Sequence, residues 1–131
     1  MDKWIQLQNN DGTDNLYPVE KIDLLWQNSS PTSNFSAQTV SINLSGYDRL
    51  LLVFVMMKSG DDSYCQGFIV DKSHTKWTCG GLYQNTYVSR LVDVSDSGVT
   101  FGSGYASSTS NQSAVIPNEI YGIKLKTHDL R

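Results

Sequence analysis

The sequence predicts an all-β protein: an antiparallel β-sandwich, jelly-roll-like, preceded by a short N-terminal β-hairpin. Several segments alternate apolar and polar residues with the two-residue period of a half-buried strand, as in residues 36–44. Turn residues recur at short intervals between these segments. No stretch sustains the 3.6-residue apolar period of a helix, whereas an α/β fold would need helical crossovers.

The first 23 residues are expected to form an N-terminal hairpin or assembly segment, and residues 24–131 the sandwich domain. Strands at 4–8 and 16–19 would flank a turn containing Asp11-Gly12, a strong hairpin signal. An isolated two-stranded hairpin is only marginally stable in water. The hairpin must therefore pack on the sandwich or on another copy of the chain. The alternative is that its strands are an ordinary extra pair within the same sandwich.

The middle of the chain predicts the centre of the sandwich. Residues 50–57 are apolar at every position, as expected of a central strand that is buried on both faces. Strands at 64–70 and 76–79 would form a hairpin around the turn at 71–75. Cys65 and Cys79 would then face one another, so a disulfide is sterically possible. Because the expected compartment is reducing, two free, buried thiols are the prediction.

The second half continues the strand pattern. Residues 87–94 alternate, although Arg90 falls on the apolar face and Leu91 on the polar one. A short strand is expected at 99–101, an exposed Ser/Gly/Asn-rich loop at 103–113, and two final strands at 114–116 and 121–125. The predicted core comprises Val40, Ile42, Leu44, Leu50, Leu52, Phe54, Phe68, Val70, Ile123 and Leu125.

Composition restricts the partners. A chain of 131 residues fits one sandwich, and it carries a formal charge of -3 with only 18% charged residues and no Lys/Arg cluster. Binding to nucleic acid or to anionic lipid is therefore disfavoured. The longest apolar run, 50–57, is too short to cross a bilayer. The N-terminus lacks the pattern of a signal peptide, so we expect no general secretory export.

Residues able to do chemistry are sparse. His74 falls in a predicted turn and His128 near the C-terminus, so neither is expected to activate a nucleophile. Asp61-Asp62 resembles a glycosidase carboxylate pair but is more typical of a solvated turn. Residues 9–14 offer oxygen ligands without the spacing of an EF-hand. The prediction is no catalytic residue, no metal and no cofactor.

Three aromatic residues are the candidate ligand contacts. Trp77 and Tyr83 flank a predicted turn at Gly80-Gly81, and Tyr105 lies in the predicted long loop. Aromatic faces that stack on a pyranose, among Ser, Thr and Asn, are typical of sugar recognition. The same composition is ordinary for a β-sandwich, so both interpretations stay open.

Several segments together carry a resemblance to a known class of proteins. Residues 4–19 resemble the opening of many tail-fibre and other virion proteins of phages and prophages of gut bacteria. Residues 25–40, 44–48, 94–101 and 116–124 resemble a β-rich module that recurs in the same proteins. The resemblance implies a structural protein of the virion tail, commonly a homotrimer, folded in the cytoplasm of the bacterial host. It supplies no catalytic residues.

Two functions follow as hypotheses. The first is a non-enzymatic tail-fibre or baseplate module for host-surface binding or assembly. Its partners are expected to be other tail or baseplate proteins, with a host-surface glycan as a further candidate. It is expected to form a homo-oligomer, with a trimer favoured. Its contacts would come from one face of the sandwich and from the hairpin residues Trp4, Ile5, Leu7, Leu16 and Tyr17. The alternative is a carbohydrate-binding β-sandwich module of a bacterial or phage enzyme system, which predicts a monomer.

Overall fold

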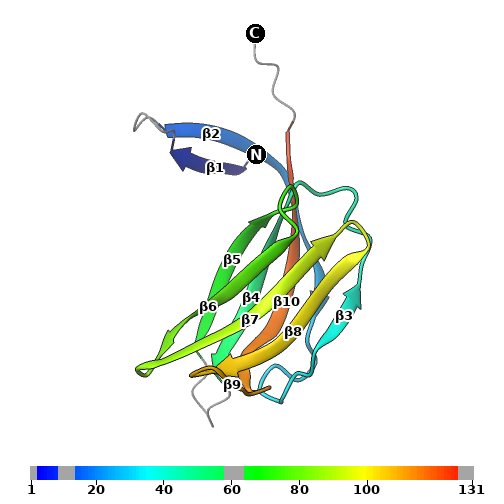
Figure 1. Ribbon diagram of the computed structural model, residues 1–131. Coiled ribbons are helices and arrows are strands. Elements are labelled where there is room, and N and C mark those ends of the chain that lie inside the picture. Colours follow the sequence, from blue (N-terminus) through cyan, green and yellow to red (C-terminus); the bar gives the residue numbers. More distant parts are fainter. Residues whose placement is uncertain (1–2, 9–13, 58–63, 127–131) are drawn as a thin grey trace.

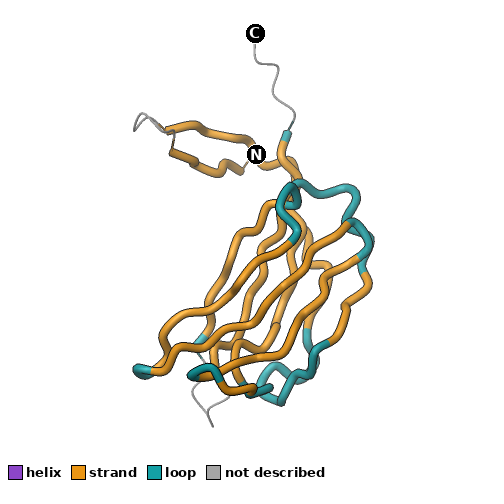
Figure 2. The backbone as a smooth tube through the Cα atoms, viewed as in Figure 1, coloured by secondary structure: helices purple, strands orange, loops and turns teal. Residues whose placement is uncertain are grey.

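The protein is an all-β structure, as the sequence predicts. A computed structural model describes residues 3–8, 14–57 and 64–126, and these contain strands and loops but no helix (Figures 1 and 2). The strands are β1 (Lys3–Gln8), β2 (Asp14–Gln27), β3 (Gln38–Ser41), β4 (Arg49–Met57), β5 (Cys65–Asp71), β6 (Lys76–Tyr83), β7 (Thr86–Ser95), β8 (Gly98–Ala106), β9 (Thr109–Ser110) and β10 (Ala114–Leu125).

The strands form two antiparallel sheets that pack face to face as a β-sandwich (Figure 1). Sheet 1 has the strand order β1-β2-β10-β4-β5. Sheet 2 has the order β3-β8-β7-β6, with the short β9 paired to β8. The strands β5 and β6 are therefore edge strands of the two different sheets.

The connection between β5 and β6 differs from the sequence prediction. The two strands belong to different sheets, so the expected hairpin of 64–70 with 76–79 is wrong. Residues 72–75 instead carry the chain from one sheet to the other. The Lys72 ammonium anchors this crossover, because it donates to the carbonyls of Leu44 at 2.7 Å and Tyr47 at 3.0 Å and pairs with Asp96 at 2.6 Å.

The two cysteines are separated by this crossover. Both thiols are free, but only Cys79 is buried, whereas Cys65 is exposed on the edge strand β5. The expectation that both are buried is wrong for Cys65, and their predicted cross-strand pairing does not occur. The turn residues at 71–75 indicate that the chain reverses, but not which sheet the next strand joins.

Strands also extend further than the sequence indicates. Most of the predicted loop at 103–113 belongs to β8 and β9, which a tight turn joins at Ser107 and Ser108, both with positive φ. The two predicted C-terminal strands are one strand, β10, with a register shift between Pro117 and Glu119. The shift lies next to Pro117, which has no N–H to donate to the ladder.

The hydrophobic core lies between the sheets. Among the predicted core residues, Val40, Leu44, Leu50, Leu52, Phe54, Val70 and Ile123 are buried. Ile42, Phe68 and Leu125 are only partly buried. Sheet 2 contributes inward residues beyond that list, namely Val88, Val92, Val94, Val99 and Phe101.

The apolar strand β4 is not buried equally on its two faces. Leu50, Leu52 and Phe54 point into the core, whereas Leu51 and Val53 are half-buried on the outer face of sheet 1. The prediction of burial on both faces is thus correct for the inner face and, on the outer face, for Val55, which is 2% exposed. Phe54 packs edge-on against Phe101 of the opposite sheet, with ring centroids 6.1 Å apart.

Among the residues whose burial is described, Arg90 is the charged residue that is buried in the core, with a relative exposure of 0%. Its position on β7 matches the alternation of the sequence, which places it on the apolar face between Val88 and Val92. The guanidinium donates to three backbone carbonyls: Gly102 at 2.6 Å, Val115 at 2.8 Å and Ala114 at 3.0 Å. These carbonyls come from both sheets, so the side chain ties β7 and β8 to the start of β10.

The backbone around Arg90 is adapted to its side chain at two positions, Gly104 and Val115. Gly104 lies opposite Arg90 in the β7–β8 register, and a Cβ at this glycine would come within 2.8 Å of the guanidinium Nη2. Only glycine leaves that space. Val115 has φ +48°, a left-handed conformation that a β-branched residue rarely adopts and that costs of the order of 1–3 kcal/mol. The hydrogen bond from Arg90 to its carbonyl helps to hold this conformation.

The N-terminal hairpin is present and projects beyond the end of the sandwich (Figure 1). β1 pairs with the first part of β2, from Lys3 opposite Val19 to Gln8 opposite Asp14. β2 then pairs with β10 from Val19 to Gln27 and joins sheet 1. The strand therefore crosses the expected boundary at 23/24 without a break. The predicted turn at Asp11-Gly12 lies outside the described residues.

Candidate binding surfaces

The three aromatic residues predicted as ligand contacts do not form one site. Trp77 and Tyr83 lie at opposite ends of β6, about 20 Å apart at the rise of a β-strand. Trp77 packs against the core, and its indole N–H donates to the carbonyl of His74 at 2.7 Å. Tyr105 lies on β8, opposite Ser89. Gly80-Gly81, expected as a turn, lies inside β6.

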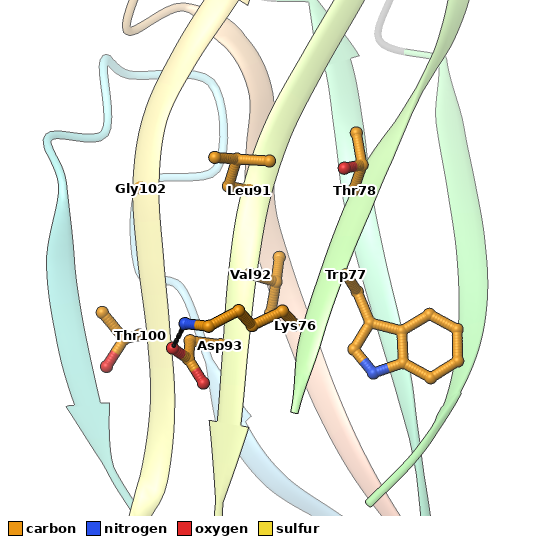
Figure 3. A pocket seen from close by; sticks show the side chains of 8 residues that line it. All are labelled: Lys76, Trp77, Thr78, Leu91, Val92, Asp93, Thr100 and Gly102. Carbon is orange, nitrogen blue, oxygen red and sulfur yellow. Dashed lines mark hydrogen bonds and ion pairs between the residues drawn. The ribbon is translucent and has the colours of Figure 1, made fainter. Parts of the chain in front are cut away.

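A hollow of about 330 Å³ opens on the outer face of sheet 2, across β6, β7 and β8 (Figure 3). Leu91 stands over it and is 58% exposed, while Lys76 and Asp93 form an ion pair of 2.8 Å beside it. Figure 3 shows the Trp77 indole apart from these side chains. The ion pair is largely exposed, so it adds little to stability. The sequence signal for this hollow is Leu91, an apolar residue on the polar face of its strand.

A second cavity, of about 360 Å³, lies between the edge strands β5 and β6. The rings of Tyr64 and Tyr83 meet here with centroids 5.9 Å apart and planes tilted by 59°. Tyr64 is 61% exposed. We call this cavity the Tyr64–Tyr83 groove; its lining residues are Met56, Tyr64, Cys65, Gln66, Leu82, Tyr83 and Gln84.

Sequence reasoning identified only one residue of this groove, Tyr83. The others were missed because the groove requires β5 and β6 to lie in different sheets, which the predicted hairpin precluded. Gln84 and Asn85 have φ of +48° and +66°, the left-handed pair of a tight β-hairpin turn between β6 and β7. Their polar character between two alternating segments is the signal that could have located this end of the groove.

The outer face of sheet 1 carries a row of apolar residues. Leu24, Tyr121, Leu51 and Ile69 are aligned by the register across β2, β10, β4 and β5. Leu24 and Ile69 are exposed, and the other two are half-buried. We call this set the apolar row. It lies in the same sheet as the N-terminal hairpin, since Leu24 belongs to β2.

The residues predicted for the oligomer interface lie on β1 and β2. In the hairpin register, Ile5 is opposite Tyr17 and Trp4 is opposite Pro18, while Leu7 and Leu16 occupy neighbouring rungs. The five predicted residues thus occupy adjacent positions along both strands of the ribbon. This places them together on one element, at the end of the sandwich that the hairpin extends.

Among the described residues, burial or neighbouring groups shift the pKa values of several side chains. The backbone N–H of Ser73 donates to Asp71 and lowers the pKa of that carboxyl, with a smaller effect from Arg49. Burial raises the pKa of the Cys79 thiol to about 12. Tyr47 donates to Asp23 at 2.6 Å, and this hydrogen bond raises the pKa of the phenol.

Residues 3–8, 14–57 and 64–126 contain neither a group of three or more His, Cys, Asp or Glu side chains placed to hold a metal ion nor a helix that could span a membrane. His74 is in the crossover between the sheets, and its ring lies edge-on to Trp77. His128, Asp61, Asp62 and most of the oxygen-rich segment 9–14 lie outside the described residues.

No protein-family model, curated protein or solved structure matches this chain. The function therefore has to be inferred from the residues and surfaces described above.

Proposed function

We propose that the protein is a non-enzymatic virion module, a tail-fibre or baseplate component of a phage or prophage that binds the host surface or completes the assembly as a homotrimer. The observation that carries the proposal is the N-terminal hairpin. It extends past the sandwich and is joined to sheet 1 by one unbroken strand, β2 (Figure 1). The resemblance of residues 4–19 to the opening of tail-fibre proteins falls on this same element.

The hairpin has the physical properties of an assembly element. Among the described strands, β1 pairs with β2 alone, so its outer edge presents backbone groups that another strand can bind. A two-stranded ribbon gains stability when it packs on a further surface. A symmetry-related copy supplies such a surface without a second gene product.

The apolar row supports the same proposal. It aligns apolar residues across four strands of sheet 1. Two of them, Leu24 and Ile69, are exposed, and this exposed apolar surface favours burial against another chain. Because Leu24 lies on the strand that forms the hairpin, a single interface can include both features. Three linked copies also raise the effective affinity of a weak surface contact.

Particles from a culture that carries this gene test the proposal. The chain should sediment with intact virions in a density gradient and remain with the tails when heads and tails are separated, as detected by mass spectrometry of each fraction. A known tail protein and a soluble host enzyme serve as controls. Recovery of the chain only with the soluble host enzyme would contradict the proposal.

The Tyr64–Tyr83 groove favours one alternative, a carbohydrate-binding module of a bacterial or phage enzyme system. Two tyrosine rings beside side-chain amides suit a sugar. This alternative shares the sandwich but predicts a monomer, and the hairpin would then be an extension of sheet 1. The mass of the chain in solution separates the two functions.

A further inference from the structure

The described residues that line the Tyr64–Tyr83 groove combine apolar and hydrogen-bonding groups, and none of them is charged. Tyr64, Tyr83 and Leu82 provide apolar surface, and the phenol hydroxyls and the amides of Gln66 and Gln84 can both donate and accept hydrogen bonds. Among the residues that the structure describes, no Lys, Arg, His, Asp or Glu lines it. Its volume of about 360 Å³ is at the lower end of the range for small-molecule sites.

We propose that this groove binds a neutral saccharide. The ring carbons of a pyranose form an apolar face that can lie on a tyrosine ring, while its hydroxyls need partners that both donate and accept. The groove offers these two kinds of contact side by side. The proposal rests on the host-surface binding included in the proposed function, and it names the chemical class of the ligand.

The charges of the groove argue against other small ligands. Phosphate or carboxylate groups are held by arginine, lysine or helix N-termini, and the described lining residues include none of these. A cationic ligand would need a carboxylate, which the described lining residues do not supply either. A purely apolar ligand would leave the Gln66 and Gln84 amides without partners when it displaced water. A neutral ligand with many hydroxyls can donate to and accept from the Gln66 and Gln84 amides.

The backbone keeps the groove open. Gly81 faces its floor, where a Cβ would lie 3.5 Å from the Gln66 Oε1 atom and 3.9 Å from the Met56 Cε atom. A larger side chain at this position would extend into the space between the sheets. At the other end, the tight turn at Gln84 and Asn85 fixes Gln84 at the rim. The site is thus formed by strand ends and a defined turn.

Chemical modification of Cys65 tests the proposed saccharide site in the wild-type protein. It lines the groove and is exposed, whereas Cys79 is buried, so a maleimide should modify Cys65 alone in the folded protein. The probe is an array of neutral hexose and N-acetylhexosamine oligosaccharides together with sialylated and sulfated ones. We expect binding to at least one neutral oligosaccharide, loss of that binding after modification, and slower modification when the oligosaccharide is present.

A pair of tyrosine variants locates the binding. Tyr64→Ala removes one ring of the groove, and Tyr87→Ala is the matched control, because Tyr87 is 53% exposed and does not line the groove. Both sites are exposed, so the melting temperatures should stay close to that of the wild type. The Kd of the neutral oligosaccharide, measured by titration calorimetry, should rise about tenfold or more for Tyr64→Ala and stay within about twofold for Tyr87→Ala.

The outcomes also separate this site from the proposed function. No binding on the array, binding to anionic glycans only, or equal Kd values for the two tyrosine variants would overturn the saccharide site. A trimer that binds no saccharide would leave the assembly role standing. A monomer that binds a neutral saccharide through Tyr64 would support the site and contradict the trimeric virion module.

Discussion

Replacing Arg90 by methionine tests the reasoning about the core most severely. Methionine is unbranched, flexible and compatible with a buried, apolar position. The substitution leaves the carbonyls of Gly102, Ala114 and Val115 without the guanidinium that now donates to them. Replacing a buried charge by an apolar side chain stabilises the variant, whereas the loss of these hydrogen bonds destabilises it. The larger of the two effects sets the sign of the change in unfolding free energy.

The hydrogen bonds should dominate. Bonds to a charged group contribute about 1.5–3 kcal/mol each, so the three short bonds give roughly 5–9 kcal/mol. Removing a buried charge returns several kcal/mol, because desolvation penalises the cation. The same desolvation lowers the pKa of Arg90 to about 10. The net loss expected for Arg90→Met is about 3–5 kcal/mol of unfolding free energy.

Urea unfolding followed by tryptophan fluorescence measures this loss, with Arg90→Lys as the comparison. A lysine keeps the charge but lacks the planar fork that reaches three carbonyls, so it should also be destabilised by more than about 2 kcal/mol. A loss below about 1 kcal/mol for Arg90→Met would refute the claim that the carbonyls depend on the guanidinium. If Arg90→Lys unfolds at the wild-type urea concentration, the positive charge rather than the planar guanidinium would be what stabilises the core.

Three further outcomes follow from single side chains. Phe54→Ala should lower the unfolding free energy by about 3–5 kcal/mol in the same assay, because Phe54 is fully buried between the sheets; an unchanged midpoint would remove it from the core. The Cys79 thiol stays protonated in the folded state up to about pH 12 and in the unfolded state only to about pH 9, so stability should fall as the pH rises above 9. Cys79→Ala should lack that part of the decline, and parallel pH profiles would contradict the assignment. The pKa of Asp71 is lowered on folding, so it stabilises the protein above its unfolded pKa, and this contribution is lost as the pH falls through the folded value. Asp71→Asn should therefore show a smaller loss of stability on acidification below about pH 4, and an equal loss would exclude this role.

The alternation of residues was a sufficient guide to the fold class and to much of the core. It placed Arg90 on the inner face of β7 although arginine is rarely buried, and the structure confirms that position. Periodicity reports which face a side chain occupies, whatever its type. Periodicity could not show which groups bind the buried guanidinium, because its three carbonyl partners lie on β8 and β10.

Most differences between the predicted and the observed strands arise from pairing between segments that are distant in the sequence. A turn at 71–75 is compatible both with a hairpin and with a crossover between sheets, and only the partners of β5 and β6 distinguish them. Composition likewise suggested a loop for 103–113, but pairing with β7 extends β8 through this Ser/Gly-rich segment. The Tyr64–Tyr83 groove depends on the crossover, so its members could not be grouped from the sequence alone.

The mass of the chain in solution directly tests whether the N-terminal hairpin holds a trimer together. Light scattering at tens of micromolar should give three times the 14.6 kDa of one chain. Removing residues 1–18 deletes β1 and the part of β2 that pairs only with β1, and it keeps the pairing of β2 with β10 from Val19 to Gln27. The shortened chain should retain the circular dichroism of the sandwich and have the mass of a monomer. A full-length chain that is monomeric at this concentration would contradict the account, as would a trimer that survives the truncation.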